Sequence, residues 1–274
     1  MIPLALGIFG LIVGSFLNVL IIRHGVRSIG GRSACMACGR QLLWHDMIPV
    51  VSWITLAGRC RHCRTSISPQ YPLVEAATGI LFAMIGAAPF PTDIAYKLLF
   101  CTIAALLIAI TVYDLRHTII PDLWAYTFAG LALFSALAFP IQTTNYWPTV
   151  LLAGPIAALP LFAFWFFSRG RWMGLGDAKL ALGIGWLLGP IYGIFAVFLA
   201  FIIGAVVSVC VLLPLPHIVR LFKKAGIARS GSSISYTMKS EIPFGPFLIV
   251  SCFIVWFSIL YNVNIFGLFG VVLP

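Results

Sequence analysis

Charged side chains are scarce in this sequence. They make up 9% of its 274 residues, and 61% of the residues are hydrophobic, whereas soluble domains carry about 25% charged residues. No water-soluble fold covers so much apolar surface, so the composition excludes a soluble enzyme or binding module. It predicts an integral membrane protein.

Acidic residues are the scarcest charged type, with 7 Asp and Glu against 17 Lys and Arg, for a formal net charge of +10. In a soluble protein this excess would indicate nucleic-acid binding. Here the basic residues are scattered through segments that border hydrophobic runs, where they orient the chain and contact anionic lipid. We therefore expect membrane lipid, and no nucleic acid, as a partner.

Eight hydrophobic runs predict transmembrane helices. They cover residues 3–22, 71–90, 95–113, 123–140, 148–168, 178–188, 190–213 and 244–272. The run at 178–188 is shorter than the roughly 20 residues that a bilayer requires. The first run lacks a basic start and is followed by Arg23, so we expect it to stay in place as a helix and not to be a cleaved signal peptide.

The basic residues also predict the orientation of these helices. All the Lys and Arg residues except Lys97 lie in four loops, at 23–70, 114–122, 169–179 and 214–243. With eight spans, these loops share one face of the membrane, which the positive-inside rule makes cytoplasmic. Both termini then face outward.

Two cysteine pairs stand in the first basic loop, Cys35-Met-Ala-Cys38 and Cys60-Arg-His-Cys63, with 21 residues between the pairs. Four thiolates in paired spacing suit a tetrahedral zinc ion, and a closed site of this kind leaves no open position for catalysis. Disulfides or unrelated thiols are the alternative, but disulfides rarely persist in the cytoplasm. We expect zinc to organise this loop.

These patterns predict an all-α polytopic membrane protein with about eight transmembrane helices and a small zinc-binding cytoplasmic loop domain. Its parts would be a first helix at 1–22, the four-cysteine domain at 23–70, and a membrane helical domain at 71–274.

Two acidic residues stand at the ends of predicted spans on the same side of the membrane. Asp114 ends the third run and Asp177 begins the sixth. Two carboxyl groups that meet there can share one proton, so that one activates water while the other polarises a peptide carbonyl. The alternatives are structural: Asp177 could cap its helix, Asp114 could pair with Arg116 or Lys179, and Asp122 is a rival partner that could itself be a cap.

Several motifs together resemble the type IV prepilin peptidases over nearly the whole chain. They are Gly14-Ser-Phe-Leu-Asn18 with Arg23, the cysteine pairs with Pro49-Val-Val-Ser-Trp53 between them, Ile67-Ser-Pro-Gln-Tyr-Pro-Leu-Val-Glu75, Asp114 with Ile120-Pro121-Asp122, Gly174-Leu-Gly-Asp177-Ala-Lys179, and Ile242-Pro-Phe-Gly-Pro246. The family often has Asn before Ile-Pro, where this chain has Asp46-Met-Ile-Pro49.

The resemblance implies that Asp114 and Asp177 are an aspartyl catalytic dyad in the bacterial inner membrane. The implied reactions are cleavage of a basic leader after glycine, from prepilins or pseudopilins of type IV pilus and type II secretion systems, and methylation of the new N-terminus. S-adenosylmethionine would be the methyl donor. The sequence contains no nucleotide-binding fingerprint, so it identifies no residues that bind this cofactor, and it predicts no oligomeric state.

Two other classes of function fit parts of the pattern. A presenilin-like intramembrane aspartyl protease would use the same two acids without a methyl donor or a zinc loop. A non-enzymatic membrane carrier or assembly scaffold would use them as helix caps or ion ligands.

Overall fold

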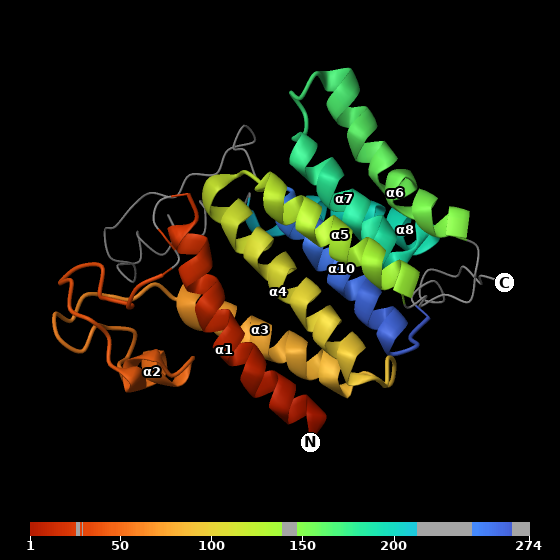
Figure 1. Cartoon of the computed structure of the whole chain (residues 1–274). Coiled ribbons are helices and arrows are strands. Elements are labelled where there is room, and N and C mark those ends of the chain that lie inside the picture. The colour runs from red at the N-terminus through yellow and green to blue at the C-terminus, as the bar shows by residue number, and fades with distance from the viewer. Residues whose placement is uncertain (26–27, 29, 139–146, 213–242, 265–274) are drawn as a thin grey trace. The chain divides into compact units, whose positions relative to one another are not determined.

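The structure is a computed structural model that describes residues 1–25, 28, 30–138, 147–212 and 243–264 (Figure 1). The described residues form helices, together with two isolated β-bridges, Ala34 with Gln41 and Arg59 with Ser66. The prediction of an all-α chain is therefore confirmed for the described part. The cations predicted in the loop 214–243 lie outside the described residues.

Each of the eight predicted hydrophobic runs overlaps a helix in the described part of the chain. The helices are α1 (Ile2–Arg23), α3 (Gln70–Ala87), α4 (Ile94–His117), α5 (Asp122–Ala138), α6 (Trp147–Ser168), α7 (Leu175–Leu188), α8 (Pro190–Val207) and α10 (Gly245–Leu260). A single π-helical turn, η2 (Ser208–Leu212), continues α8, and the loop after α1 holds η1 (Trp44–Met47) and α2 (Val51–Thr55).

Four described helices are long and apolar enough to cross a membrane: α1, α4, α6, and α8 with its continuation to Cys210. Helices α5 and α10 are apolar but shorter, with 17 and 16 residues, and α7 has 14 residues. By length and composition the chain is a membrane protein, while the count of eight spans stays a prediction.

The chain divides into two compact units. Unit 1 comprises Met1–Tyr113 with Phe257–Pro274, and unit 2 comprises Asp114–Trp256. The cysteine pairs belong to unit 1. Asp114 and Asp177 both belong to unit 2.

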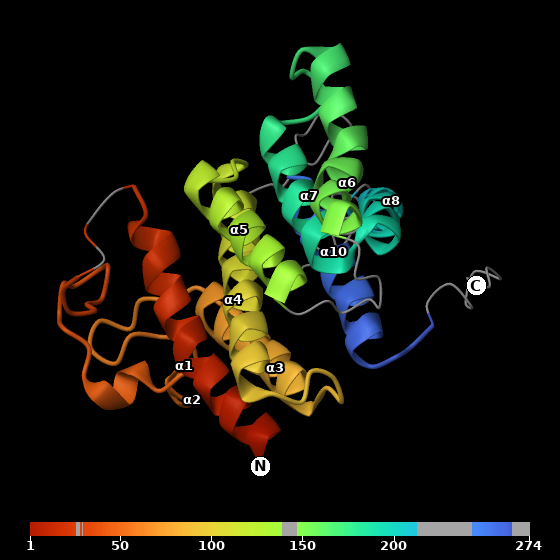
Figure 2. The ribbon, with the colours of Figure 1, turned by 45° about the vertical axis from the view of Figure 1, so that its right-hand side comes forward.

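Helices α1 and α3 pack against each other in unit 1 (Figures 1 and 2). Glycines in α1 permit this contact, because a Cβ on Gly10 would lie 2.9 Å from the Cα of Gly79 and a Cβ on Gly14 would lie 2.7 Å from the Cα of Glu75. Small residues four apart are a common way for membrane helices to bring their backbones together. The spacing of the glycines in α1 thus fixes where α3 lies against it.

Lys97, the cation that the orientation prediction places on the opposite side, is buried in α4. Its ammonium group donates hydrogen bonds to the carbonyl oxygens of Gly86 at 2.7 Å and Ala88 at 3.1 Å. These carbonyls form the C-terminal end of α3, where a positive charge complements the helix dipole. Lys97 therefore joins the end of α3 to the start of α4.

Helix α7 is the central element of unit 2. It packs against α5, α6 and α8 (Figure 2). Its glycines allow these contacts, since a Cβ on Gly183 would lie 2.5 Å from a ring carbon of Phe128 and a Cβ on Gly185 would lie 2.7 Å from the Cβ of Ala157. A helix of only 14 residues is thereby fixed on three sides, and this fixes the position of Asp177 in its first turn.

Candidate active site and metal centre

Asp114 lies in the last turn of α4 and is 4% exposed. The chain leaves the helix just after it, where the Thr118 amide donates to the Asp114 carbonyl at 2.7 Å and Thr118 takes a positive φ of 53°. The carboxylate of Asp114 accepts a hydrogen bond from the backbone N–H of Gly245. A main-chain donor at the start of α10 therefore orients this carboxyl group.

Gly245 makes this approach possible because it has no side chain. A Cβ at this position would lie 2.5 Å from Oδ2 of Asp114 and 3.3 Å from Cδ1 of Ile120, closer to the oxygen than non-bonded carbons in proteins come. Glycine at residue 245 thus leaves the space that the Asp114 carboxylate occupies.

Asp177 is the third residue of α7 and is 9% exposed, while Gly174 occupies the N-cap. A Cβ on Gly176 would lie 3.1 Å from the Cβ of Ile120, so the start of α7 runs close beside this side chain. A negative charge on the Asp114 carboxylate repels a negative charge on Asp177, so the two carboxyl groups interact electrostatically. The structure therefore brings both acids into one region of unit 2, around the buried side chain of Ile120.

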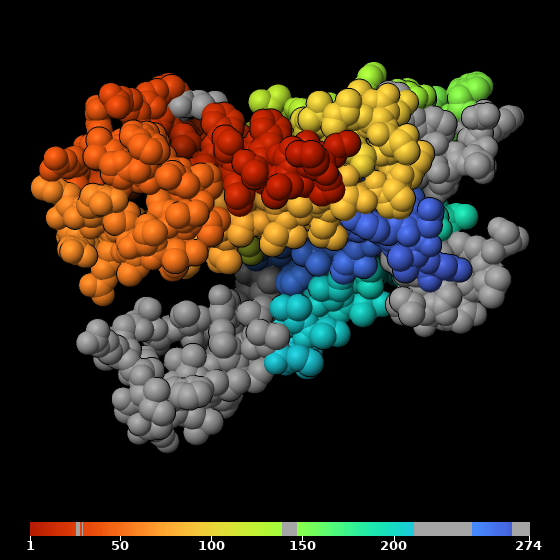
Figure 3. Space-filling view, turned by 90° about the horizontal axis from the view of Figure 1, so that it is seen from below, coloured from red at the N-terminus to blue at the C-terminus, as the bar shows by residue number. Residues whose placement is uncertain are grey.

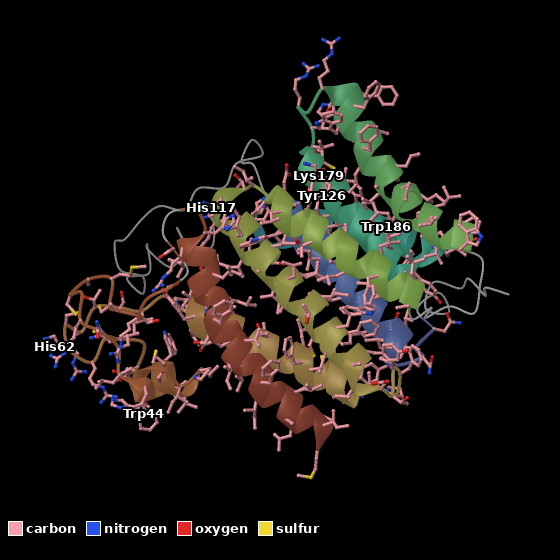
Figure 4. The ribbon with its side chains drawn as sticks, viewed as in Figure 1. Trp44, His62, His117, Tyr126, Lys179 and Trp186 are labelled. Atoms are coloured by element: carbon pink, nitrogen blue, oxygen red, sulfur yellow. The ribbon has the colours of Figure 1, made fainter. Side chains whose placement is uncertain are left out.

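Asp122, the rival candidate acid, takes a different role. It is the first residue of α5, and its carboxylate lies 2.6 Å from Nζ of Lys179 on α7. The same ammonium group lies 5.1 Å from the ring centre of Tyr126 (Figure 4). Lys179 therefore pairs with Asp122 and not with Asp114, and the side chain of Asp122 is 66% exposed. This ion pair joins the N-terminal ends of α5 and α7.

The four predicted metal ligands come together in unit 1. The Sγ atoms of Cys35, Cys38, Cys60 and Cys63 all lie within 4.8 Å of one another. All four thiols are free, and Sγ of Cys35 is 3.8 Å from Sγ of Cys63, far beyond a disulfide bond of about 2.05 Å. Zinc–sulfur bonds of about 2.3 Å give a tetrahedron whose edges are about 3.8 Å. The cluster therefore suits a zinc ion.

The two cysteine pairs repeat the same backbone geometry. The Cys35 amide donates to the Arg40 carbonyl at 2.9 Å, and the Cys60 amide donates to the Thr65 carbonyl at 2.8 Å. Each pair thus lies in a tight turn that is closed by its own first cysteine. Each turn directs its two sulfur atoms toward the same point. The loop domain needs no large hydrophobic core to bring these atoms together.

Hydrogen bonds in the turns favour the thiolate form that a metal requires. Backbone N–H groups of Cys38 and Ala37 lower the pKa of Cys35. The Thr65 hydroxyl, 3.3 Å from Sγ of Cys63, and the Thr65 amide lower the pKa of Cys63 to about 6. Desolvation and hydrogen bonds with the neighbouring thiols instead raise the pKa of Cys38 to about 11, so the shift toward the thiolate form belongs to Cys35 and Cys63.

Two further acids hold the loop domain together. Asp46 accepts a hydrogen bond from Nε of Arg61 at 2.9 Å, so it joins η1 to the second cysteine pair. Glu75 is buried in α3 and accepts a hydrogen bond from the amide of Val50 at 2.7 Å. Through Val50, Glu75 joins the loop to the membrane helices.

The sequence motifs include Gly176 and Gly245, but they do not show that both glycines lie against Ile120. Gly245 stands in the Ile242-Pro-Phe-Gly-Pro246 motif, and a glycine between a phenylalanine and a proline was a visible signal. Ile120 is an ordinary apolar residue in sequence. That it lies between Gly176 and Gly245 emerges only when segments more than 50 residues apart meet.

Comparison with known protein families agrees with this arrangement. Residues 8–88 match the bacterial peptidase A24 N-terminal domain, and residues 101–209 match the type IV leader peptidase family. The first match covers α1, the cysteine pairs and α3. The second match covers both Asp114 and Asp177.

Individual relatives carry consistent names. The chain is 33% identical to the prepilin leader peptidase/N-methyltransferase of Myxococcus xanthus, over 75% of this chain and 62% of the relative, so the match covers less than two thirds of that protein. It is 32% identical to the type 4 prepilin-like proteins leader peptide-processing enzyme of Escherichia coli, over 69% of this chain and 78% of the relative. It is also 32% identical to the prepilin leader peptidase/N-methyltransferase of Pectobacterium carotovorum, over 68% and 74%. No solved structure matches the chain.

Proposed function

The chain belongs to the type IV leader peptidase family of enzymes, and on this premise we propose that it is an aspartyl endopeptidase for prepilins or pseudopilins. In this proposal it removes the basic leader after a glycine, at the cytoplasmic face of the bacterial inner membrane. It then methylates the new N-terminal residue. These clients belong to type IV pilus and type II secretion systems.

The observation that supports the peptidase half is the burial of Asp114 and Asp177 in one region of unit 2, near Ile120. They are two of the three buried acids in the described part of the chain, and one acts electrostatically on the other. Burial of two carboxyl groups has a cost in free energy, which helix capping would not require. Paired buried carboxyl groups are instead the arrangement that acid–base catalysis uses.

In the proposed hydrolysis one carboxyl group is ionised and the other protonated. The carboxylate takes a proton from water, the water oxygen adds to the scissile carbonyl carbon, and the acid gives its proton to the carbonyl oxygen. When the tetrahedral intermediate collapses, the carbon–nitrogen bond breaks and the amine nitrogen takes a proton from one carboxyl group, while the other, ionised carboxyl group takes a proton from a hydroxyl of the intermediate, which restores the dyad with one proton. No covalent enzyme intermediate forms.

The substrate would enter through its apolar stem. The leader is basic, and the loops that the charge pattern assigns to the cytoplasm are basic too, so long-range attraction does not recruit it. An apolar stem between helices at the membrane boundary brings the glycine bond to the level of Asp114 and Asp177. In this proposal the chain crosses the membrane eight times, which places both acids at the cytoplasmic side.

For the methyltransferase half, S-adenosylmethionine would supply the methyl group. The names of the relatives support this activity. The zinc ion, bound by Cys35, Cys38, Cys60 and Cys63, would be structural, because four thiolates leave no open coordination position. We assign no residue to the methyl donor.

The test of the dyad is cleavage of a prepilin by Asp114→Asn and Asp177→Asn variants in membranes. Each variant should lose about 10²–10⁴-fold in cleavage rate, the usual contribution of acid–base catalysis. Asp93→Asn is the matched control. Asp93 accepts a hydrogen bond from the Ala95 amide at 2.8 Å, and Asn at this position keeps that bond while it removes a charge.

Normal cleavage by either variant, at wild-type protein levels, would rule out the dyad and favour the carrier or scaffold. Transfer of labelled methyl groups to the cleaved prepilin separates the bifunctional enzyme from a presenilin-like protease. Cleavage without any transfer would leave only the peptidase half.

A further inference from the structure

The loop domain returns toward the membrane after it leaves α1. Its Val50 amide donates to Oε2 of Glu75, and Glu75 is the sixth residue of α3. At about 1.5 Å per residue, Glu75 lies roughly 7.5 Å along the helix from its first residue. Since α2 begins at the residue after Val50, this hydrogen bond fixes α2 at the level of the early turns of α3.

A second contact fixes the orientation of α2. The indole N–H of Trp53 donates to the Ile67 carbonyl at 3.2 Å, just before α3 begins. In Figures 1 and 2, α2 lies beside the length of α1 and not beyond its C-terminal end. Figure 3 shows the loop domain as a continuous mass against α1 and α3. The loop therefore extends alongside the membrane helices.

The segment Trp44–Thr55, here called the boundary segment, exposes large apolar side chains at this level. They are Trp44 (75% exposed), Met47, Ile48, Val51 (53%) and Ile54 (64%). Trp44 lies at the outer edge of the loop domain (Figure 4). An exposed apolar patch of this kind marks a surface that contacts lipid or protein.

The surrounding charges favour lipid. Arg59, Arg61 and Arg64 follow the boundary segment in the chain and are exposed, and Asp46 within the segment pairs with Arg61. Arginines beside apolar side chains are the usual pattern of segments that bind anionic headgroups, and tryptophan prefers the membrane interface.

We propose that the boundary segment lies in the membrane–water interface, with Val51 and Ile54 among the lipid acyl chains and the neighbouring arginines on anionic headgroups. The lipid-facing surface of α3 continues it, because Leu73, in the first turn of α3, is also exposed. The loop is connected to α1 at one end and to α3 at the other, so the boundary segment stays close to the membrane surface. The cysteine site then holds the arginines above the interface.

Photo-crosslinking of the full chain in lipid nanodiscs tests this inference. The photoreactive residue p-benzoylphenylalanine replaces Val51 or Ile54, and in the control variant it replaces Met36, which is more exposed than either residue but lies within the first cysteine pair. Nanodiscs contain phosphatidylcholine with or without phosphatidylglycerol. Intact mass measurement should show severalfold more lipid adduct at residues 51 and 54 than at residue 36.

The adducts should also be richer in phosphatidylglycerol than the nanodisc is, and Arg59→Gln with Arg64→Gln should remove that enrichment. Adducts to a second copy of the chain or to an added prepilin, in place of lipid, would overturn the inference. So would the absence of adducts at both positions, or equal lipid labelling at Met36. The readout needs no peptidase or methyltransferase activity, so it stands apart from the proposed function.

Discussion

At the scale of single residues, the absence of a side chain at residue 245 decides how Asp114 is held. In Gly245→Ala the added methyl group would lie 2.5 Å from Oδ2 of Asp114, so the carboxylate must move by about 1 Å. A shift of this size in a catalytic group costs about 10²-fold in rate. We expect prepilin cleavage to fall by that factor while the affinity for prepilin is kept, as measured by kcat and KM separately.

Gly130→Ala is the control for this substitution, because a Cβ on Gly130 meets nothing within 4 Å and alanine favours the helix. It should cleave at the wild-type rate. If Gly245→Ala did so too, the close approach would be irrelevant to activity.

Val50, in the loop domain, has a strained backbone conformation. Its φ is 62° and its ψ is −50°, and the Val51 amide bonds back to the Pro49 carbonyl at 2.6 Å, which defines a rare kind of γ-turn. Such a backbone costs a β-branched residue about 1–3 kcal/mol. The Glu75 carboxylate holds the amide of Val50 in this conformation.

Val50→Gly should therefore stabilise the protein. Glycine adopts a positive φ without strain, and its greater freedom in the unfolded chain costs about 0.5–1 kcal/mol, so the net gain should lie between about 0 and 2.5 kcal/mol. Thermal unfolding in detergent measures it as a higher midpoint. A lower midpoint would mean that the valine side chain contributes more by contact than its backbone costs.

At the scale of secondary-structure elements, the ion pair between Lys179 and Asp122 connects α5 to α7. It lies two residues from Asp177, so it sets how the first turn of α7 stands against α5. We expect Lys179→Asp and Asp122→Lys each to lower kcat for prepilin cleavage by about tenfold, through displacement of Asp177. The double exchange restores the pair with its ends reversed and should recover most of the rate.

Rescue by the double variant is the critical comparison, because a general loss of stability would not be repaired by a second substitution. A double variant that is as slow as the worse single variant would show that Lys179 acts on the substrate or on Asp177 directly.

At the scale of the whole molecule, the cysteine cluster and the acids lie in separate compact units, so the two proposed activities should respond differently to loss of the metal. We expect the wild type to contain about one zinc ion per chain, and the double variant Cys35→Ser with Cys60→Ser to contain none. Methylation should fall more than cleavage, because the loop domain loses its order. Elemental analysis and parallel assays measure both effects.

A wild-type preparation without zinc, made in the absence of chelators, would contradict this prediction. Equal losses of both activities would instead mean that the loop domain supports the whole fold.

The sequence predicted the helices well because apolar runs and basic loops follow directly from the cost of polar groups in lipid. It predicted the cysteine cluster because four thiols in two tight turns need little else to converge. It did not predict that Lys179 pairs with Asp122, or that Asp46 pairs with Arg61, because several partners of suitable charge lie near each end in sequence. The meeting of Gly176, Ile120 and Gly245 depends on packing between distant helices, which no local pattern encodes.

The donor to Asp114 is part of the main chain, and this has a consequence for how the site tolerates mutation. Every amino acid but proline carries that amide, so no exchange of functional groups at residue 245 deletes it. Among substitutions that keep the amide, the size of the new side chain therefore decides the outcome. Proline would remove the amide, but it would also place a Cβ 2.5 Å from Oδ2 of Asp114, so no single exchange deletes the donor and leaves the carboxylate in place.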